Sequence, residues 1–133
     1  MIKLFIGGKG SGKTKTLIEM VNNAANESKG NVVCIEKGDK LIHDITYKAR
    51  LIDTKAFAVS NAESLYGFIA GILASNSDIT DIFVDSALKI VGDDTASFEA
   101  MLKKLGNVTS DVNLVMTASI AVEECPEGIK AYT

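Results

Sequence analysis

Residues 7–14 read GGKGSGKT and carry the clearest chemistry in the chain. They match the phosphate-binding pattern GxxxxGK(S/T) in full, and they directly follow the apolar run at residues 2–6. Glycines let a backbone wrap closely around phosphate oxygens, and a helix starting at the end of such a loop points its N-terminal dipole at them. The predicted nucleotide-binding residues are Gly7, Gly8, Lys9, Gly10, Ser11, Gly12, Lys13, Thr14 and, from a later strand, Ser119.

Two residues of this stretch have more specific predicted roles. Lys13 is expected to reach the β and γ phosphates of a nucleotide and to act in catalysis, and Thr14 is expected to offer its hydroxyl to Mg²⁺. In open α/β sheets the ligand lies at the carboxyl ends of the strands. Asp85 ends the apolar run at 81–85 and is therefore predicted to hold Mg²⁺ opposite Thr14.

A base that activates water is harder to assign. Ser86 follows Asp85 at the position where many ATPases carry a catalytic glutamate, so hydrolysis is expected to be slow or to use a base from elsewhere. Glu36 ends the run at 31–36 and is the candidate base; a solvated loop glutamate is the alternative, and both stay open. Thr117 and Ser119 either contact the terminal phosphate or cap the following turn.

The elements that must position these residues follow from the spacing of apolar residues. The expected strands are 2–6, 31–36, 49–53, 81–85 and 113–117, with a last short strand at 128–132. One helix is expected to start near Gly12 and close at Gly30, a second to follow a capping box of Ser60 and Glu63, and a third to end at Gly106. Alternating strands and helices predict an α/β fold, a three-layer α/β/α sandwich whose mostly parallel sheet of about five strands has helices on both faces.

Composition narrows the classes of function. The 133 residues are 47% hydrophobic, which suits a single domain over 1–133 with a real core. A net charge of −3 argues against a nucleic-acid-binding scaffold. Cys34, Cys125 and the single histidine, His43, lack the spacing of a zinc site. No apolar run is long enough to span a bilayer, and a cytoplasmic location is the default expectation.

The chain as a whole resembles the RecA-like branch of P-loop ATPases. The resemblance rests on the loop at 7–14, an acidic residue ending the second strand, the segment FVDSAL around Asp85, and VMTAS at 115–119. It implies a P-loop NTPase fold, ATP and Mg²⁺ as ligands, and Glu36 as the catalytic glutamate, with Asp39 competing for that role. Members of this branch often drive assemblies or remodel partners, which implies a protein partner or a homo-oligomer. The compact core is also similar to that of thymidine kinases, although the cysteines of their zinc-bound lasso are missing.

These observations predict an Mg-ATP-binding protein that is a weak ATPase acting with a partner. Transition-state charge on a γ-phosphate is often neutralised by an arginine, and Arg50 is the only arginine in the chain. Low intrinsic turnover is therefore expected if Arg50 does not reach the nucleotide. The alternatives are an ATP-dependent regulatory switch without useful turnover, and a small-molecule or nucleoside kinase.

Overall fold

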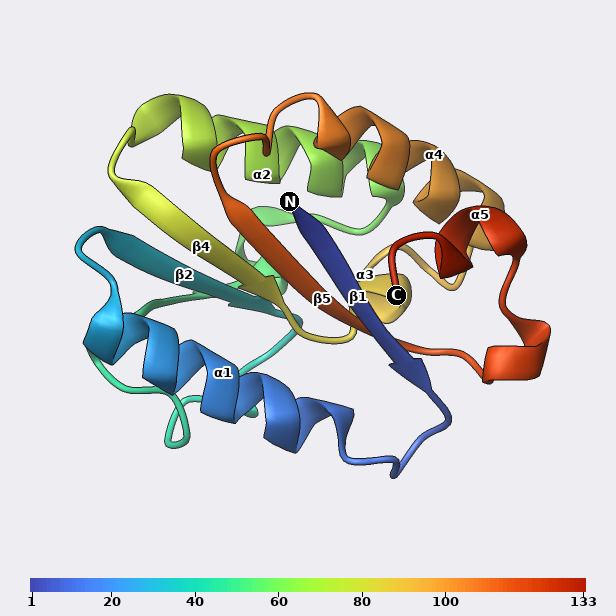
Figure 1. Ribbon diagram of the computed structural model, residues 1–133, viewed down its shortest axis with the longest axis horizontal. Coiled ribbons are helices and arrows are strands. Elements are labelled where there is room, and N and C mark those ends of the chain that lie inside the picture. Colours follow the sequence, from blue (N-terminus) through green and yellow to red (C-terminus); the bar gives the residue numbers. More distant parts are fainter.

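The computed structural model describes residues 1–133 and has five strands in one sheet (Figure 1). The strands are β1 (Ile2–Gly7), β2 (Asn31–Glu36), β3 (Arg50–Asp53), β4 (Ile79–Val84) and β5 (Asn113–Ser119). Their order across the sheet is β1-β5-β4-β2-β3, and every neighbouring pair is parallel. The expected α/β fold with a parallel sheet of five strands is confirmed.

Helices cover both faces of this sheet and complete the predicted three-layer arrangement. Helix α1 (Lys13–Glu27) lies on one face, whereas α2 (Ala62–Ser75) and α4 (Thr95–Gly106) pack side by side on the other (Figure 1). The shorter helical segments are α3 (Ala87–Ile90), α5 (Glu127–Lys130) and the 3₁₀ turns η1 (Thr54–Phe57) and η2 (Val122–Glu124). None of the helices combines the length and hydrophobicity needed to cross a bilayer.

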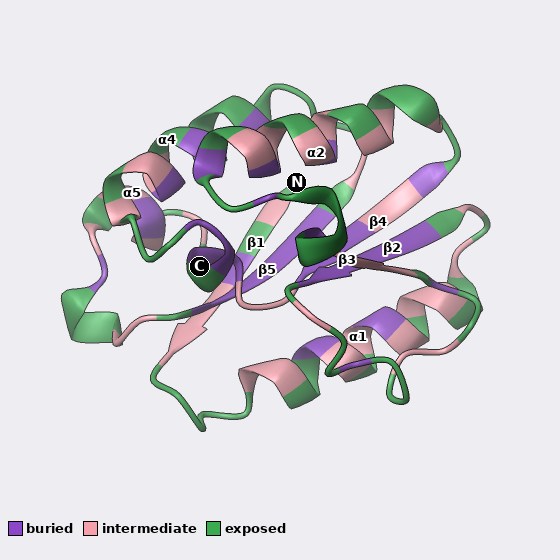
Figure 2. Ribbon diagram, turned by 180° about the vertical axis from the view of Figure 1, so that it is seen from behind, coloured by how far each residue is buried: buried purple, intermediate pink, exposed green.

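The buried side chains form two clusters, one on each face of the sheet. The strand β2 contributes to both clusters. Val33 and Ile35 belong to a cluster of 23 buried residues on the α2 face, while Val32 and Cys34 belong to a cluster of eight on the α1 face. Successive strand residues point to opposite faces, so a strand covered on both sides must be a continuous apolar run. Figure 2 shows β2, β4 and β5 as the buried middle of the molecule.

Two predicted helix boundaries need correction. The capping box before α2 is formed by Asn61 and Ser64, one residue later than the expected pair, because the Asn61 side chain accepts from the Ser64 backbone N–H and the Ser64 hydroxyl accepts from the Asn61 N–H. Helix α1 ends at Glu27, with Ser28 as its C-cap, and not at Gly30. Gly30 instead lets β2 start close to Asp78, since a Cβ at Gly30 would collide with the Asp78 carbonyl oxygen.

The strand predicted at 128–132 is wrong. The chain forms the short helix α5 there, directly after Pro126, which stands at its N-cap position. Ile129 of α5 is buried in the larger cluster, and a Cβ at Gly128 would collide with the Glu99 carboxylate of α4. Packing against α4 and the core therefore accompanies the helix, and the Tyr132 carbonyl accepts from the backbone N–H of Leu4 in β1 at 2.9 Å.

Candidate functional site

The loop between β1 and α1 is exposed and depends on glycine backbone geometry. Residues 8–12 are all exposed at the carboxyl end of β1 (Figure 2). Gly10 and Gly12 have φ angles of 77° and 85°, a conformation that side chains with a Cβ rarely adopt. A Cβ at either residue would meet no other atom within 4 Å, so glycine is required for the turn and not for lack of space.

The first turn of α1 differs from those of the other two long helices. Asn61 caps α2 and Asp94 caps α4, each by accepting a hydrogen bond from a backbone N–H of the first turn. Helix α1 has no side-chain cap and no acidic residue in its first turn, which instead carries Lys13 and Lys15. Lysines there oppose the helix dipole, and the first N–H groups lack partners. Both features become favourable when an anion binds at this end of the helix.

The Lys13 ammonium folds back over the loop. Its Nζ donates to the Gly8 carbonyl at 2.8 Å and to the Ser11 hydroxyl at 3.1 Å. These contacts hold the ammonium beside the loop backbone, in the partly exposed space in front of the helix. A cation held there adds to the attraction that the helix end exerts on an anion.

Asp85 joins three elements at the carboxyl edge of the sheet. Its Oδ1 accepts from the Thr14 hydroxyl at 3.1 Å and from the Thr117 hydroxyl at 3.0 Å. The Thr117 hydroxyl in turn accepts from the backbone N–H of Ser86 at 2.7 Å. This network exists because β5 lies between β1 and β4 in the sheet, which brings the end of β5 beside both the glycine-rich loop and Asp85.

Thr14 and Asp85 together offer oxygen ligands of the kind that Mg²⁺ prefers. Magnesium in proteins is commonly held by one or two carboxylates together with waters and phosphate oxygens. The structure brings Thr14 and Asp85 together as the sequence predicted, and a hydroxyl and a carboxylate 3.1 Å apart fit that role. The chain has no group of three or more His, Cys, Asp or Glu side chains that could hold a metal, so a cation here would also need oxygens from a bound ligand.

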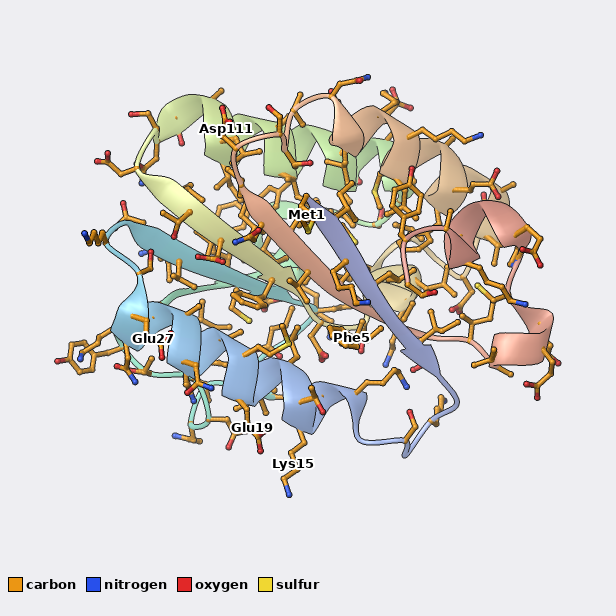
Figure 3. All side chains as sticks on the ribbon, in the orientation of Figure 1. Met1, Phe5, Lys15, Glu19, Glu27 and Asp111 are labelled. Carbon is orange, nitrogen blue, oxygen red and sulfur yellow. The ribbon has the colours of Figure 1, made fainter.

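A cavity of about 540 Å³ lies in front of this network, and we call it the lysine cavity. It contains no hydrophobic residue and no carboxylate. Five of its lining residues are lysines, drawn from the glycine-rich loop, the start of α1, the segment after β2, and α3. Figure 3 shows Lys15 extending outward from the first turn of α1. The complete lining is Lys9, Gly10, Ser11, Gly12, Lys13, Thr14, Lys15, Lys40, Ser86, Lys89 and Ser119.

The lining of the lysine cavity favours a negatively charged ligand. Five lysines around one concave space give it a positive potential, and like charges so close together repel each other unless negative charge lies between them. The volume is within the range of about 300–1,000 Å³ that is usual for small-molecule sites. The arrangement suits a multiply charged anion much better than an apolar or cationic ligand.

Glu36 does not line the lysine cavity. Its side chain is 2% exposed, and its Oε2 accepts from the backbone N–H of Leu41 at 3.2 Å. Burial raises the pKa of Glu36, and hydrogen bonds from the backbone of Leu41 and Lys40 partly oppose this shift. Burial, together with the charges of Asp85 and Glu36, raises the pKa of the nearby Cys34 thiol to about 12, so this cysteine stays protonated and inert.

The structure separates the predicted site residues into those that line the lysine cavity and those that do not. The residues that line it are Lys9, Gly10, Ser11, Gly12, Lys13, Thr14 and Ser119. Gly7, which ends β1, Gly8, which begins the loop, and Asp85, which bonds to Thr14, do not line it. The base role of Glu36 stays a prediction.

Sequence reasoning missed Lys40 and Lys89. Both follow soon after a strand ends, at the same sheet edge as the predicted hydroxyl and acidic residues. The sequence signal for them is a cation within about five residues of a strand end, because the carboxyl ends of parallel strands meet at one edge.

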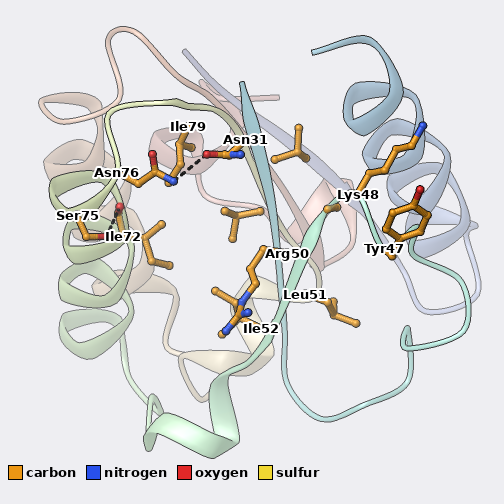
Figure 4. Close-up of a pocket in the computed structure, with 13 residues that line it drawn as sticks. Asn31, Tyr47, Lys48, Arg50, Leu51, Ile52, Ile72, Ser75, Asn76 and Ile79 are labelled. Atoms are coloured by element: carbon orange, nitrogen blue, oxygen red, sulfur yellow. Dashed lines mark hydrogen bonds between the residues drawn. The ribbon is translucent and has the colours of Figure 1, made fainter. Parts of the chain in front are cut away.

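The larger cavity of the protein, about 670 Å³, lies elsewhere (Figure 4). It is formed by the start of β2, the edge strand β3 and the end of α2, where the Asn76 amide donates to the Asn31 side chain at 2.9 Å. Eight of its 13 lining residues are hydrophobic. Arg50 lines this cavity and not the lysine cavity, so the only arginine of the chain is not part of the cationic site.

No protein-family model matches the chain, and no curated protein matches it. The interpretation of the site therefore rests on its geometry and chemistry.

Proposed function

We propose that this protein binds a nucleoside triphosphate, with ATP as the best candidate, together with Mg²⁺. The observation that carries the proposal is the uncapped, lysine-bearing start of α1, which opens on a cavity lined by five lysines without a carboxylate. A triphosphate carries about four negative charges, enough to offset most of these ammonium groups. The resemblance of residues 7–14 to a P-loop agrees with this reading.

Each residue has a definite task in this proposal. Backbone N–H groups of the loop and of the first turn of α1 would bind phosphate oxygens, with Lys13 neutralising the terminal phosphates. Thr14 and Asp85 would hold Mg²⁺, which when bound supplies positive charge that polarises the phosphates. Thr117 orients the Asp85 carboxylate from behind through its hydroxyl.

We further propose that hydrolysis by the isolated chain is slow. The lysine cavity contains no carboxylate that could act as a base, and Glu36 is buried with its carboxylate bonded to Leu41. Arg50 lines the other cavity, so any arginine that stabilises the transition state must come from a protein partner or a second copy. A weak ATPase that depends on a partner fits these facts.

The absence of a carboxylate from the lining of the lysine cavity also favours the second candidate, a nucleotide-dependent switch that binds ATP without useful turnover. The kinase alternative is less well supported. The hollow that adjoins the lysine cavity, beside Leu88 and Asp93, has a volume of only about 160 Å³. This is below the usual size of a site for an acceptor molecule.

A single-turnover experiment tests the proposal. Excess protein is mixed with labelled ATP and Mg²⁺, and bound ATP and released ADP are followed together, with Lys13→Ala and Arg50→Ala as paired variants. Slow, Lys13-dependent release of ADP supports the weak ATPase, and retention of intact ATP supports the switch. Binding that is equal in the wild type and Lys13→Ala would refute the phosphate site.

A further inference from the structure

The segment after β2 is held in place by two acidic side chains. The Glu36 carboxylate accepts from the backbone N–H of Leu41 at 3.2 Å, and the Asp53 carboxylate at the end of β3 accepts from the N–H of Gly38 at 2.7 Å. Gly38 has a φ of 102°, which lets the chain turn between these two anchors. Leu41 is 3% exposed and packs in the cluster on the α1 face. These hydrogen bonds at Gly38 and Leu41 restrict the conformational freedom of the segment between them.

Lys40 lies between the two anchored residues and lines the lysine cavity. Its neighbour Lys37 is also exposed, yet it does not line the cavity. Burying a glutamate with no cation beside it costs free energy, and the hydrogen bond from the Leu41 N–H offsets part of that cost. The same hydrogen bond orders the loop that places Lys40 at the lysine cavity.

The position of Lys40 within the cavity is distinctive. Lys9 and Lys89 also line the small adjoining hollow, whereas Lys13, Lys15 and Lys40 do not. Of these three, Lys13 and Lys15 belong to the first turn of α1, so Lys40 alone comes from the segment after β2. Along the sheet edge the strand ends follow in the order β1, β5, β4, β2. A phosphate chain that starts at the loop after β1 and runs along this edge past Thr14 and Asp85 would extend toward the segment after β2.

We infer that Lys40 is the residue that distinguishes a triphosphate from a diphosphate at this site, and that the buried carboxylate of Glu36 is a positioning group for it. This inference rests on the proposed function and deepens it. Lys40 binds the terminal phosphate as a point charge, and its contact is lost when that phosphate leaves. Glu36 acts only through the backbone of the loop.

The test compares dissociation constants for ATP and ADP, both with Mg²⁺, by titration calorimetry. Lys40→Ala should weaken ATP binding by about 10-fold or more, the usual effect of losing a hydrogen bond to a charged group, and leave ADP binding within about twofold. The matched control Lys37→Ala removes the same charge from the same loop and should change neither constant by more than about twofold.

The positioning role of Glu36 has its own test. Glu36→Gln keeps a side-chain oxygen that accepts from the Leu41 N–H, so it should retain the ATP preference, while Glu36→Ala should lose it as Lys40→Ala does. Combining Glu36→Ala with Lys40→Ala should cause no further loss. Hydrogen exchange at the Leu41 amide, without nucleotide, should quicken in Glu36→Ala and stay slow in Glu36→Gln.

The outcomes distinguish a failure of the roles of Lys40 and Glu36 from a failure of the proposed function. If Lys13-dependent ATP binding is intact and Lys40→Ala weakens ATP and ADP equally, or neither, the role of Lys40 is refuted and the proposed function stands. If Glu36→Ala keeps the ATP preference, or Glu36→Gln loses it, the positioning role is refuted. If the wild-type protein binds neither nucleotide, the proposed function and this inference both fail.

Discussion

The face of the sheet that packs against α2 and α4 buries a cluster of 23 residues, whereas the α1 face buries a cluster of eight. The long helices on the first face are capped by Asn61 and Asp94, and Phe98, Leu65 and Ile69 are completely buried there. Helix α1 contributes only Leu17 and Val21 as fully buried residues, and its first turn has no cap.

This difference indicates that one face mainly supplies stability and that the other carries the proposed nucleotide site. A helix that starts with lysines and without a cap is weaker by itself, so the fold needs a larger core elsewhere to tolerate it. The α2 face supplies that core, and the start of α1 keeps N–H groups available for a ligand. Substitutions on the two sides should therefore separate stability from nucleotide binding.

The largest expected effect is a loss of stability caused by a substitution on the α2 face. Phe98→Ala should lower the free energy of unfolding by about 3–5 kcal/mol, because it leaves a cavity in the larger cluster. Urea denaturation measures this change, and Phe57→Ala, at a residue that is 60% exposed, serves as the control. A loss of less than about 1 kcal/mol at Phe98 would mean that this face is not the stabilising one.

The next largest effect is a loss of ATP binding without a loss of stability, for a substitution at the start of α1. Lys13→Ala should weaken ATP binding by about 10- to 100-fold, since it removes a charged donor to the phosphates. Its stability should be unchanged or slightly higher, because a lysine in the first turn opposes the helix dipole. Calorimetric titration and urea denaturation on the same samples give both numbers, and a clear loss of stability would contradict the separation of the two sides.

A smaller effect on ATP affinity is expected for Asp85, at the carboxyl edge of the sheet. Asp85→Asn keeps an oxygen that accepts from Thr14 and Thr117 but loses the charge that would hold Mg²⁺. ATP affinity measured with Mg²⁺ should fall by about 10-fold, to roughly the value found with EDTA. A variant that still gains affinity on adding Mg²⁺ would place the metal ligand elsewhere.

The smallest effect concerns pH. Burial raises the pKa of Glu36 above its ordinary 4.5, so the native state binds this proton more tightly than the unfolded state does. The wild-type protein should therefore lose stability relative to Glu36→Gln as pH rises from 4.5 through the native pKa, and the difference should then level off. Urea denaturation of both proteins from about pH 4 to about pH 8 measures it, and a difference of opposite sign would mean that the ionised carboxylate is favoured on folding.

Local sequence patterns were sufficient for most elements. Continuous apolar runs predicted β1, β2, β4 and β5, and the glycine-rich loop predicted the start of α1, because each signal lies within a few residues. The segment at 128–132 could not be predicted in the same way. A short strand was expected there, but the segment forms the helix α5, whose packing against α4 cannot be derived from neighbouring residues.

The sequence by itself determined the chemical types at the site: a loop suited to phosphate, a hydroxyl and a carboxylate suited to Mg²⁺, and a parallel sheet with helices on both faces. Only the tertiary structure decided which residues meet. The strand order brings Thr117 to Asp85 and gathers Lys40 and Lys89, from the segments after β2 and β4, at the lysine cavity. It leaves Arg50 at the other cavity. The physical reason is that residue types and local periodicity are properties of short segments, whereas the neighbours of a strand are set by packing across the whole sheet.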